Sequence, residues 1–400
     1  MNLEMEFLAK LNTLPVFDTH EHLPYPTGQE RGFFESLHYA ESDLLSAGMP
    51  VPFKKAEDKA AVFERYYAKA QNTAYFRAVR RYVRDLYDID RLEGAALLRL
   101  DSMFRKNAAQ PESWYTHVLK EKCHIQTALT VHDGSTMRHA ILKPILYLDF
   151  LLRRSQIRYA NEQHGTKLCF EEYLVYVESW LEEWIDFGAV AGKCGTPYWR
   201  DMDFYPASEQ AAKVEYETEN ERNPHFEGYL FHRILAMFEK KGIPIQFHTG
   251  HIEPQSVNLR EHHSEWSDPA PFSRLAAMYP QLKMVLLHTG FPYSDMYFSL
   301  VKNVPNLYAD FSWIYLISPM LAERNLHLAL ELIPISKIIG FGGDAENVEL
   351  VYGHLCAAKE VMAKVFAERV KSGWFSRSEA EIYMAALLYG NAEAVYDRAK

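Results

Sequence analysis

Leu14-Pro15-Val16-Phe17-Asp18-Thr19-His20-Glu21-His22 is an apolar run that ends in two histidines separated by one residue. Side chains alternate along a β-strand, so His20 and His22 are expected to point to one face and Glu21 to the other. Two imidazoles would then converge on one point. By itself the pattern fits two ordinary histidines as well as it fits a metal site. Its position at the end of an apolar strand favours the metal site.

Similar apolar runs recur along the chain, and several precede segments of helical period, which predicts βα units and a parallel sheet. The predicted strands are Leu14 to His22, His124 to Val131, one within Ile141 to Leu152, Ala189 to Cys194, Ile243 to His248, Lys283 to His288, Asn306 to Phe311 and Lys337 to Asp344. The third is the hardest to place, because Pro144 and a long apolar stretch fit helix and strand alike. Eight such units predict an α/β fold, the (β/α)8 TIM barrel.

The segments between the predicted strands carry helix signatures. Phe170, Leu174, Val177 and Leu181 recur at helical spacing, and Gly188 stands where this helix would end. A predicted strand follows at once. Short helix-to-strand joints of this kind are ordinary in α/β proteins.

From Pro26 to Lys120 the alternation is absent and the segment is predicted to be helical, with one apolar stripe formed by Val79, Tyr82, Val83 and Leu86. We interpret residues 27–120 as a mostly helical insertion after the first strand, within a single domain that spans residues 1–400. Loops after barrel strands open onto the catalytic face, so the insertion is expected to roof the site and contact the substrate. The first twelve residues predict a short amphipathic helix.

Three other predicted strands also end in residues that can bind a metal or move a proton. His248 and His288 each begin a His-Thr-Gly motif, and Asp344 follows a glycine-rich run. A lone histidine there is more often a satisfied core residue, but the repeated motif favours a functional role. Asp344 has an alternative interpretation as the N-cap of a helix beginning near Glu346.

Four residues beside these strand ends are weaker candidates. Lys193, at the end of the predicted fourth strand, is interpreted as a substrate anchor, a carboxylated bridge between two ions, or a rim lysine that reaches solvent. Tyr198 and Arg200 are candidates to hold a substrate carboxylate, which a guanidinium matches in a bidentate fork. Trp313 is a candidate wall of the pocket, or simply a packed aromatic side chain.

Composition narrows the partners and the compartment. With 48% hydrophobic residues the chain can bury a large core, and its net charge of -10 comes without a basic block, which argues against nucleic acid and anionic membranes. The N-terminus lacks the pattern of a secretory signal, and no apolar stretch is long enough to span a membrane. The cysteines lie far apart and without a C-x-x-C pair. We expect a cytoplasmic homo-oligomer that acts on a small molecule. The candidate residues Tyr198 and Arg200 indicate that this molecule carries a carboxylate.

The order of these motifs resembles the amidohydrolase superfamily, and within it the branch with amidohydrolase-related hydrolases, aminocarboxymuconate-semialdehyde-type decarboxylases and, more distantly, uronate isomerases. That family has H-x-H after strand one, histidines after strands five and six, and aspartate after strand eight. The matching residues here are His20, His22, His248, His288 and Asp344. The closing segment from Leu387 to Tyr396 is also similar to the family's C-terminal helix, so the resemblance spans essentially the whole chain.

The resemblance implies a divalent metal, zinc before manganese, held by His20, His22, His248 and Asp344. It implies hydrolysis of a C–N or C–O bond of a small organic acid, with Asp344 moving the proton, His288 polarising the carbonyl and Lys193 as a further catalytic residue. Members with two ions carry a lysine at the position of Lys193, and members with one ion do without it, so the metal count stays open. Alternatives are a decarboxylase or uronate-type isomerase on the same barrel, or a non-catalytic metal-binding barrel.

Overall fold

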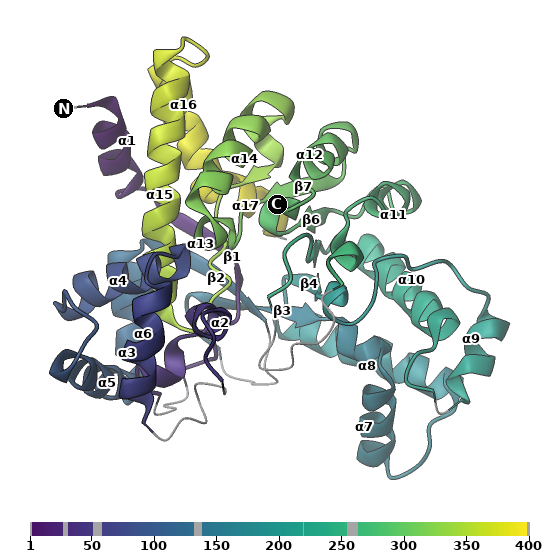
Figure 1. Ribbon diagram of the computed structural model, residues 1–400. Coiled ribbons are helices and arrows are strands. Elements are labelled where there is room, and N and C mark those ends of the chain that lie inside the picture. The colour runs from purple at the N-terminus through teal and green to yellow at the C-terminus, as the bar shows by residue number, and fades with distance from the viewer. Residues whose placement is uncertain are drawn as a thin grey trace. The chain divides into compact units, whose positions relative to one another are not determined.

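The computed structural model describes residues 2–26, 31–50, 58–131, 138–218, 220–253 and 263–397 (Figure 1). The chain forms two compact units. Unit 1 comprises residues 1–142, 252–262 and 310–392, and unit 2 comprises residues 143–251, 263–309 and 393–400. The single domain over residues 1–400 stays a prediction. None of the described helices is long and apolar enough to cross a membrane.

Eight strands follow one another in sequence order in one sheet, and the pairings that can be read residue by residue are all parallel. They are β1 (Val16–Glu21), β2 (Ile125–Val131), β3 (Leu142–Tyr147), β4 (Ala191–Cys194), β5 (Ile245–Phe247), β6 (Met284–Leu286), β7 (Leu307–Asp310) and β8 (Ile338–Ile339). In unit 1, β1 pairs with β2 from Val16 opposite Ile125. With helices between the strands, this confirms the predicted (β/α)8 fold.

Every predicted strand segment contains a strand, including the uncertain third, but most strands are shorter than predicted. The largest difference is at β8, which ends at Ile339, whereas the prediction ran to Asp344. The glycines explain it, because a Cβ on Gly342 would lie 2.6 Å from Cβ of Ser312 and one on Gly343 would lie 1.8 Å from Oε1 of Glu21. The chain after β8 is therefore a loop packed tightly against its neighbours.

The segment after β1 is helical, as predicted. Its helices are α2 (Tyr39–Ser46), α3 (Lys59–Ala70), α4 (Ala74–Tyr87), α5 (Ala95–Ala108) and α6 (Pro111–Tyr115). In α4 the predicted stripe is largely buried, with Val79, Tyr82 and Val83 in the core and Leu86 half-buried. This face packs against the long helix α15 (Val348–Lys371).

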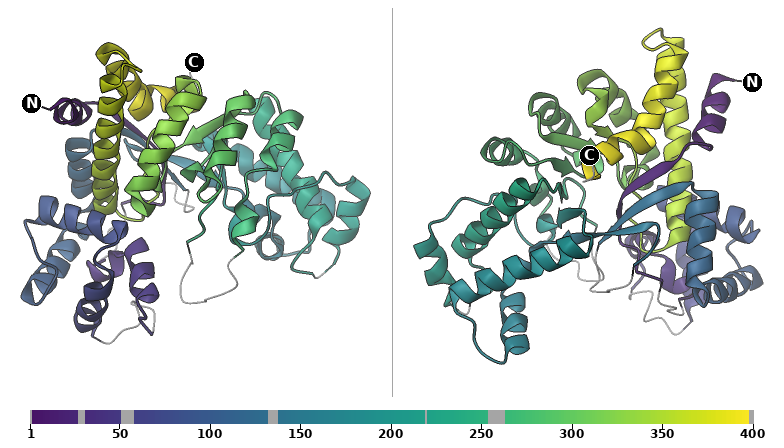
Figure 2. Two further views of the ribbon diagram at one scale, coloured as in Figure 1. Left: turned by 45° about the horizontal axis from the view of Figure 1, so that its top comes forward. Right: turned by 180° about the vertical axis from the view of Figure 1, so that it is seen from behind.

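The other helices of unit 1 pack mainly against α15. They are α1 (Leu3–Leu11), α13 (Ile314–Ile317), α14 (Pro319–Leu332) and α16 (Arg377–Ala385), and α17 (Asn391–Tyr396) follows at the end of the chain. Helix α1 confirms the predicted N-terminal helix and lies against α15, as both views of Figure 2 show. Asn2 caps it by accepting from the backbone N–H of Glu4.

Unit 2 places its helices around β3 to β7. They are α7 (Arg154–His164), α8 (Phe170–Phe187), α9 (Glu209–Tyr216), α10 (Pro224–Lys241), α11 (Phe272–Met278) and α12 (Ser294–Asn303). Helix α8 confirms the sequence prediction, since Phe170, Leu174, Val177 and Leu181 are all buried. It ends at Gly188, whose φ of 126° favours glycine.

Candidate metal centre

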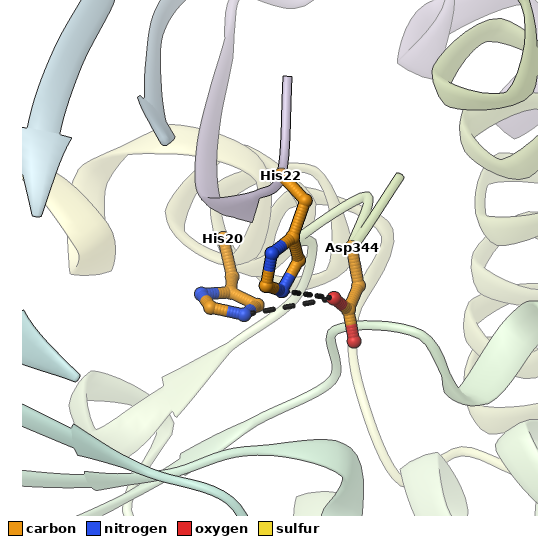
Figure 3. Close-up of side chains that lie close together, drawn as sticks. All are labelled: His20, His22 and Asp344. Atoms are coloured by element: carbon orange, nitrogen blue, oxygen red, sulfur yellow. Dashed lines mark ion pairs between the residues drawn. The ribbon is translucent and has the colours of Figure 1, made fainter. Parts of the chain in front are cut away.

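Strand β1 and the loop after β8 bring His20, His22 and Asp344 together in unit 1 (Figure 3). Nε2 of His22 lies 3.3 Å from Oδ1 of Asp344, and Nε2 of His20 lies 3.6 Å from the same oxygen. The two imidazole rings stand at 89° to each other with their centroids 5.2 Å apart. His20 is fully buried, whereas the side chain of His22 is 39% exposed. The site therefore reaches solvent on the His22 side.

These separations fit a shared cation better than direct hydrogen bonds. An N–H···O hydrogen bond is usually close to 2.9 Å. Two ligand atoms bound at about 2.1 Å to one tetrahedral ion lie about 3.4 Å apart. Two imidazole nitrogens and a carboxylate oxygen are also ligands that zinc and manganese accept. The donor set and its spacing thus suit a divalent metal.

Asp344 has an unusual backbone conformation that the surrounding peptide groups hold in place. Its φ is 51°, in the left-handed region, and its N–H donates to the carbonyl of His20 over 2.7 Å. The N–H groups on either side are bound too, since Gly343 donates to Oδ1 of Asp18 (3.0 Å) and Ala345 donates to Oε2 of Glu21 (2.7 Å). The predicted alternative role of Asp344 as an N-cap is wrong, because Asn347 caps α15.

Glu21 is therefore part of the centre's support, because its carboxylate contacts the loop that carries Asp344. Both Asp18 and Glu21 are fully buried. Burial raises the pKa of Asp18 to about 6. Burial, and then the Asp18 carboxylate, raise the pKa of Glu21 well above its usual range. The two buried carboxyl groups thus hold the backbone on both sides of Asp344.

The helical insertion supplies an aromatic column that ends on Trp313. The ring of Tyr39 stacks on Trp313 with centroids 4.8 Å apart, and Tyr75 stacks on Tyr39 at 5.3 Å. His38 lies against Tyr39 at 3.8 Å, and its Nε2 is 3.7 Å from a carboxylate oxygen of Glu346. Burial lowers the pKa of His38 to about 4, so this imidazole is neutral at pH 7. Glu346 follows Asp344 by two residues, so His38 lies near the loop that carries Asp344.

Unit 2 contains a second pair of predicted residues, His248 and His288. Nδ1 of His248 lies 3.1 Å from Nε2 of His288, and Nε2 of His248 lies 2.7 Å from the carbonyl oxygen of His251. A carbonyl only accepts, so His248 is protonated on Nε2, and in its neutral form its Nδ1 accepts from His288. The four-ligand centre stays a prediction, because it requires His248 to exchange one of these hydrogen bonds for a metal.

The remaining predicted residues also lie in unit 2. Lys193 is on β4 opposite Tyr147 and Gln246 and is buried, so the interpretation of a rim lysine that reaches solvent is wrong. The ring of Tyr198 lies 4.9 Å from that of His248. Their catalytic and substrate-binding roles stay predictions.

Arg200 is largely occupied by protein groups. Its guanidinium forms a buried ion pair with Glu227, donates to the carbonyl oxygens of Asp201 and Asp203, and lies 4.2 Å from the ring centroid of Phe204. A substrate carboxylate would have to compete with these partners. We therefore give Arg200 no part in the proposal below.

Sequence reasoning missed His38, Tyr39 and Tyr75, which come from the insertion, and the support from Asp18 and Glu21. Histidine and tyrosine are common in amphipathic helical segments. No periodic pattern in the sequence distinguishes the ones that contact a distant loop. The acidic pair did leave a signal, because two carboxyl groups within a predicted apolar strand need partners.

A family model described as "Amidohydrolase" matches residues 179–398. Protein fluG of Emericella nidulans is 27% identical over 155 residues, which is 38% of this chain. The chain matches only 17% of the length of that relative.

Among solved structures, a glucuronate isomerase from Caulobacter crescentus has a TM-score of 0.77 at 15% identity, covering 100% of this chain and 94% of its own. A uronate isomerase from Thermotoga maritima has a TM-score of 0.76 at 14% identity, covering 99% and 98%. A chain from Lactobacillus casei named as a candidate metal-dependent hydrolase has a TM-score of 0.71 at 16% identity, covering 98% of each. At these identities the likeness shows the fold alone.

Proposed function

Because the chain belongs to the amidohydrolase family, we propose that it is a metal-dependent hydrolase that cleaves a C–N or C–O bond of a small organic acid. The observation that carries the proposal is the convergence of His20, His22 and Asp344, whose ligand atoms all lie within 4.8 Å of one another. Such a set leaves room for a water and a substrate atom beside a metal ion.

We propose that His20, His22, His248 and Asp344 hold the ion, zinc before manganese. A bound divalent cation supplies Lewis acidity and lowers the pKa of a coordinated water. Both imidazoles of β1 face Oδ1 of Asp344, so Oδ2 is the atom that we assign to proton transfer. Asp344 accepts the proton of the attacking water there and returns it to the leaving group.

The other roles are assigned to unit 2 and to the aromatic column. We assign His288 to the substrate carbonyl, where its Nε2–H, which here donates to His248, would instead hold the developing negative charge. Lys193 is assigned to the substrate carboxylate or, when carboxylated, to a second ion. Tyr198 and Trp313 wall the substrate, and His38, whose Nε2 lies 3.7 Å from a carboxylate oxygen of Glu346, is suited to donate or accept a hydrogen bond near the same loop.

The test of this assignment is Asp344→Asn, measured on a panel of amides and lactones of small carboxylic acids. The amide keeps an oxygen ligand but is a poor base, so kcat should fall by a factor of about 10²–10⁴ while most of the metal is retained. Asp295→Asn, a change at an exposed carboxylate of α12, is the control. Full activity in Asp344→Asn rejects the assignment.

The second candidate is a uronate-type isomerase. It is favoured by the match of the whole fold, helical insertion included, to two uronate isomerases. The same panel extended to uronates separates the candidates, since an isomerase interconverts aldehyde and ketone without a change in mass. A decarboxylase would release carbon dioxide from aromatic or keto acids.

A non-catalytic metal-binding barrel predicts a different pattern. His20→Ala and His22→Ala would then lower metal content and thermal stability together, with no turnover of any substrate to lose. We further propose a reduced, cytoplasmic setting, because none of the described cysteines forms a disulfide. The proposed homo-oligomer is checked by light scattering coupled to size exclusion.

A further inference from the structure

Unit 1 has a cavity of about 210 Å³ that shares no lining residue with the candidate metal centre. It lies where α4 meets α13 and α15. Its floor is made of small residues, because Gly353 allows the helices to approach so closely that a Cβ there would lie 2.6 Å from the carbonyl oxygen of Ala78. Ala357 continues the floor along α15.

The wall on the side of α4 is formed by arginines. Arg77, Arg80, Arg81 and Arg84 all line the cavity, and their spacing of three and four residues places them on one face of the helix. Like charges at this spacing destabilise a helix. Four positive charges on one face of α4 favour a negatively charged partner at this cavity.

The carboxylates of the protein compensate only part of this charge. Glu360 accepts from Arg77 (2.9 Å) and from Arg81 (2.8 Å). Asp85 accepts from Arg81 and from Arg84 (2.8 Å). Among the residues that the structure describes, four guanidinium groups thus share two carboxylates, which leaves two positive charges at this place in a chain whose net charge is -10.

Arg80 carries one of the uncompensated charges. Within the described part of the chain it has no carboxylate partner, and it donates to the carbonyl of Gln71 and, at 3.5 Å, to the hydroxyl of Tyr67. The other N–H groups of its planar guanidinium remain for a ligand, and this geometry matches phosphate and carboxylate oxygens in a bidentate manner.

We propose that this arginine cavity binds a small oxyanion with at least two negative charges. Its volume is below the roughly 300–1,000 Å³ of pockets for drug-sized ligands, which favours a compact phosphate or polycarboxylate over a nucleotide or a peptide. The two surplus charges match that ligand. The site is separate from the proposed catalytic function and can hold or fail independently of it.

Isothermal titration of the full chain with inorganic phosphate, pyrophosphate and citrate tests the proposal, in chloride buffer at constant ionic strength. We expect saturable binding at one site, tighter for pyrophosphate or citrate than for phosphate. Preference for pyrophosphate identifies phosphate chemistry and preference for citrate identifies carboxylate chemistry. Removing bound metal with a chelator, and replacing His20 and His22 by alanine, should leave this binding intact.

The matched variants are Arg80→Gln with Arg84→Gln, and Arg158→Gln in unit 2. Arg84 and Arg158 have similar exposure, 55% and 51%. The double variant should bind the preferred anion at least about tenfold more weakly, because it loses charge-assisted hydrogen bonds, and the control should stay within about twofold. Arg80→Lys keeps the charge but loses the planar guanidinium group. Its affinity for the anion should therefore lie between those of the double variant and the control. Absence of saturable binding by all three anions, or equal weakening in the control, overturns the proposal.

Discussion

At Gly343 the missing side chain makes room for a carboxyl group. A Cβ there would lie 1.8 Å from Oε1 of Glu21, so Gly343→Ala must displace the side chain that holds the peptide after Asp344. We expect metal affinity to fall by about 10- to 100-fold, the usual effect of losing a group that orients a ligand.

Equilibrium dialysis with zinc measures this loss. The double variant Gly343→Ala with Glu21→Ala removes the clash and should bind zinc better than Gly343→Ala alone, a coupling expected only of groups in contact. If the effects of Gly343→Ala and Glu21→Ala on zinc affinity simply add in the double variant, positions 343 and 21 are not in contact.

The buried imidazole of His354 is expected to make the free energy of unfolding depend on pH. It is fully buried, its ring lies 2.9 Å from the carbonyl of Gly343, and burial lowers its pKa to about 4 from an ordinary 6.5. Between these values the unfolded chain binds a proton that the folded chain excludes. The contribution of His354 is therefore intact above pH 6.5 and is lost as the pH falls towards 4, by up to about 3 kcal/mol.

His354→Asn keeps a donor for the Gly343 carbonyl and removes the titration. Chemical denaturation of chelator-treated protein across this range should show a shallower loss of stability on acidification in the variant than in the wild type. Parallel curves would mean that His354 does not titrate as its burial implies.

At the scale of elements, the crossing of α4 and α15 depends on Gly353. Gly353→Ala places a methyl group 2.6 Å from the carbonyl oxygen of Ala78 in the opposite helix, where backbone has to move. We expect a loss of about 1–3 kcal/mol in the free energy of unfolding, the usual cost of overpacking.

Gly390 is the matched control, because an added Cβ meets no heavy atom within 4 Å. Gly390→Ala should be neutral or stabilising by up to about 1 kcal/mol, since alanine favours helix over glycine. Urea denaturation of both variants makes the comparison. Equal stability of the two would show that the helices do not cross so closely.

Strand ends are also decided at this scale. Periodicity located each strand, but β8 stops at Ile339 because the following glycines bring backbone against Ser312 and Glu21 instead of into the sheet. No local pattern distinguishes a glycine-rich strand end from a loop packed against distant side chains. The helix boundary at Gly188 was predictable, because it depends on the backbone of one residue.

For the whole molecule, the proposed metal links distant segments of unit 1, so its removal should lower thermal stability. A ligand at 100 times its Kd stabilises the folded state by about 2.7 kcal/mol, which corresponds to about 2 °C or more in Tm. Thermal denaturation before and after chelation, with zinc or manganese restored, measures the shift. His20→Ala should abolish the response, and an unchanged response would place the metal elsewhere.

The amino-acid sequence alone determined the eight βα units, the helical insertion and the common face of His20 and His22. These follow from periods of two and 3.6 residues, which are local properties of strands and helices. Only the tertiary structure decided the left-handed backbone of Asp344, the contact of Glu21 with the loop after β8 and the stacking of Tyr39 on Trp313. Each of these features depends on contacts between residues that are far apart along the chain. Such contacts are set by the packing of whole elements, which no local periodicity encodes.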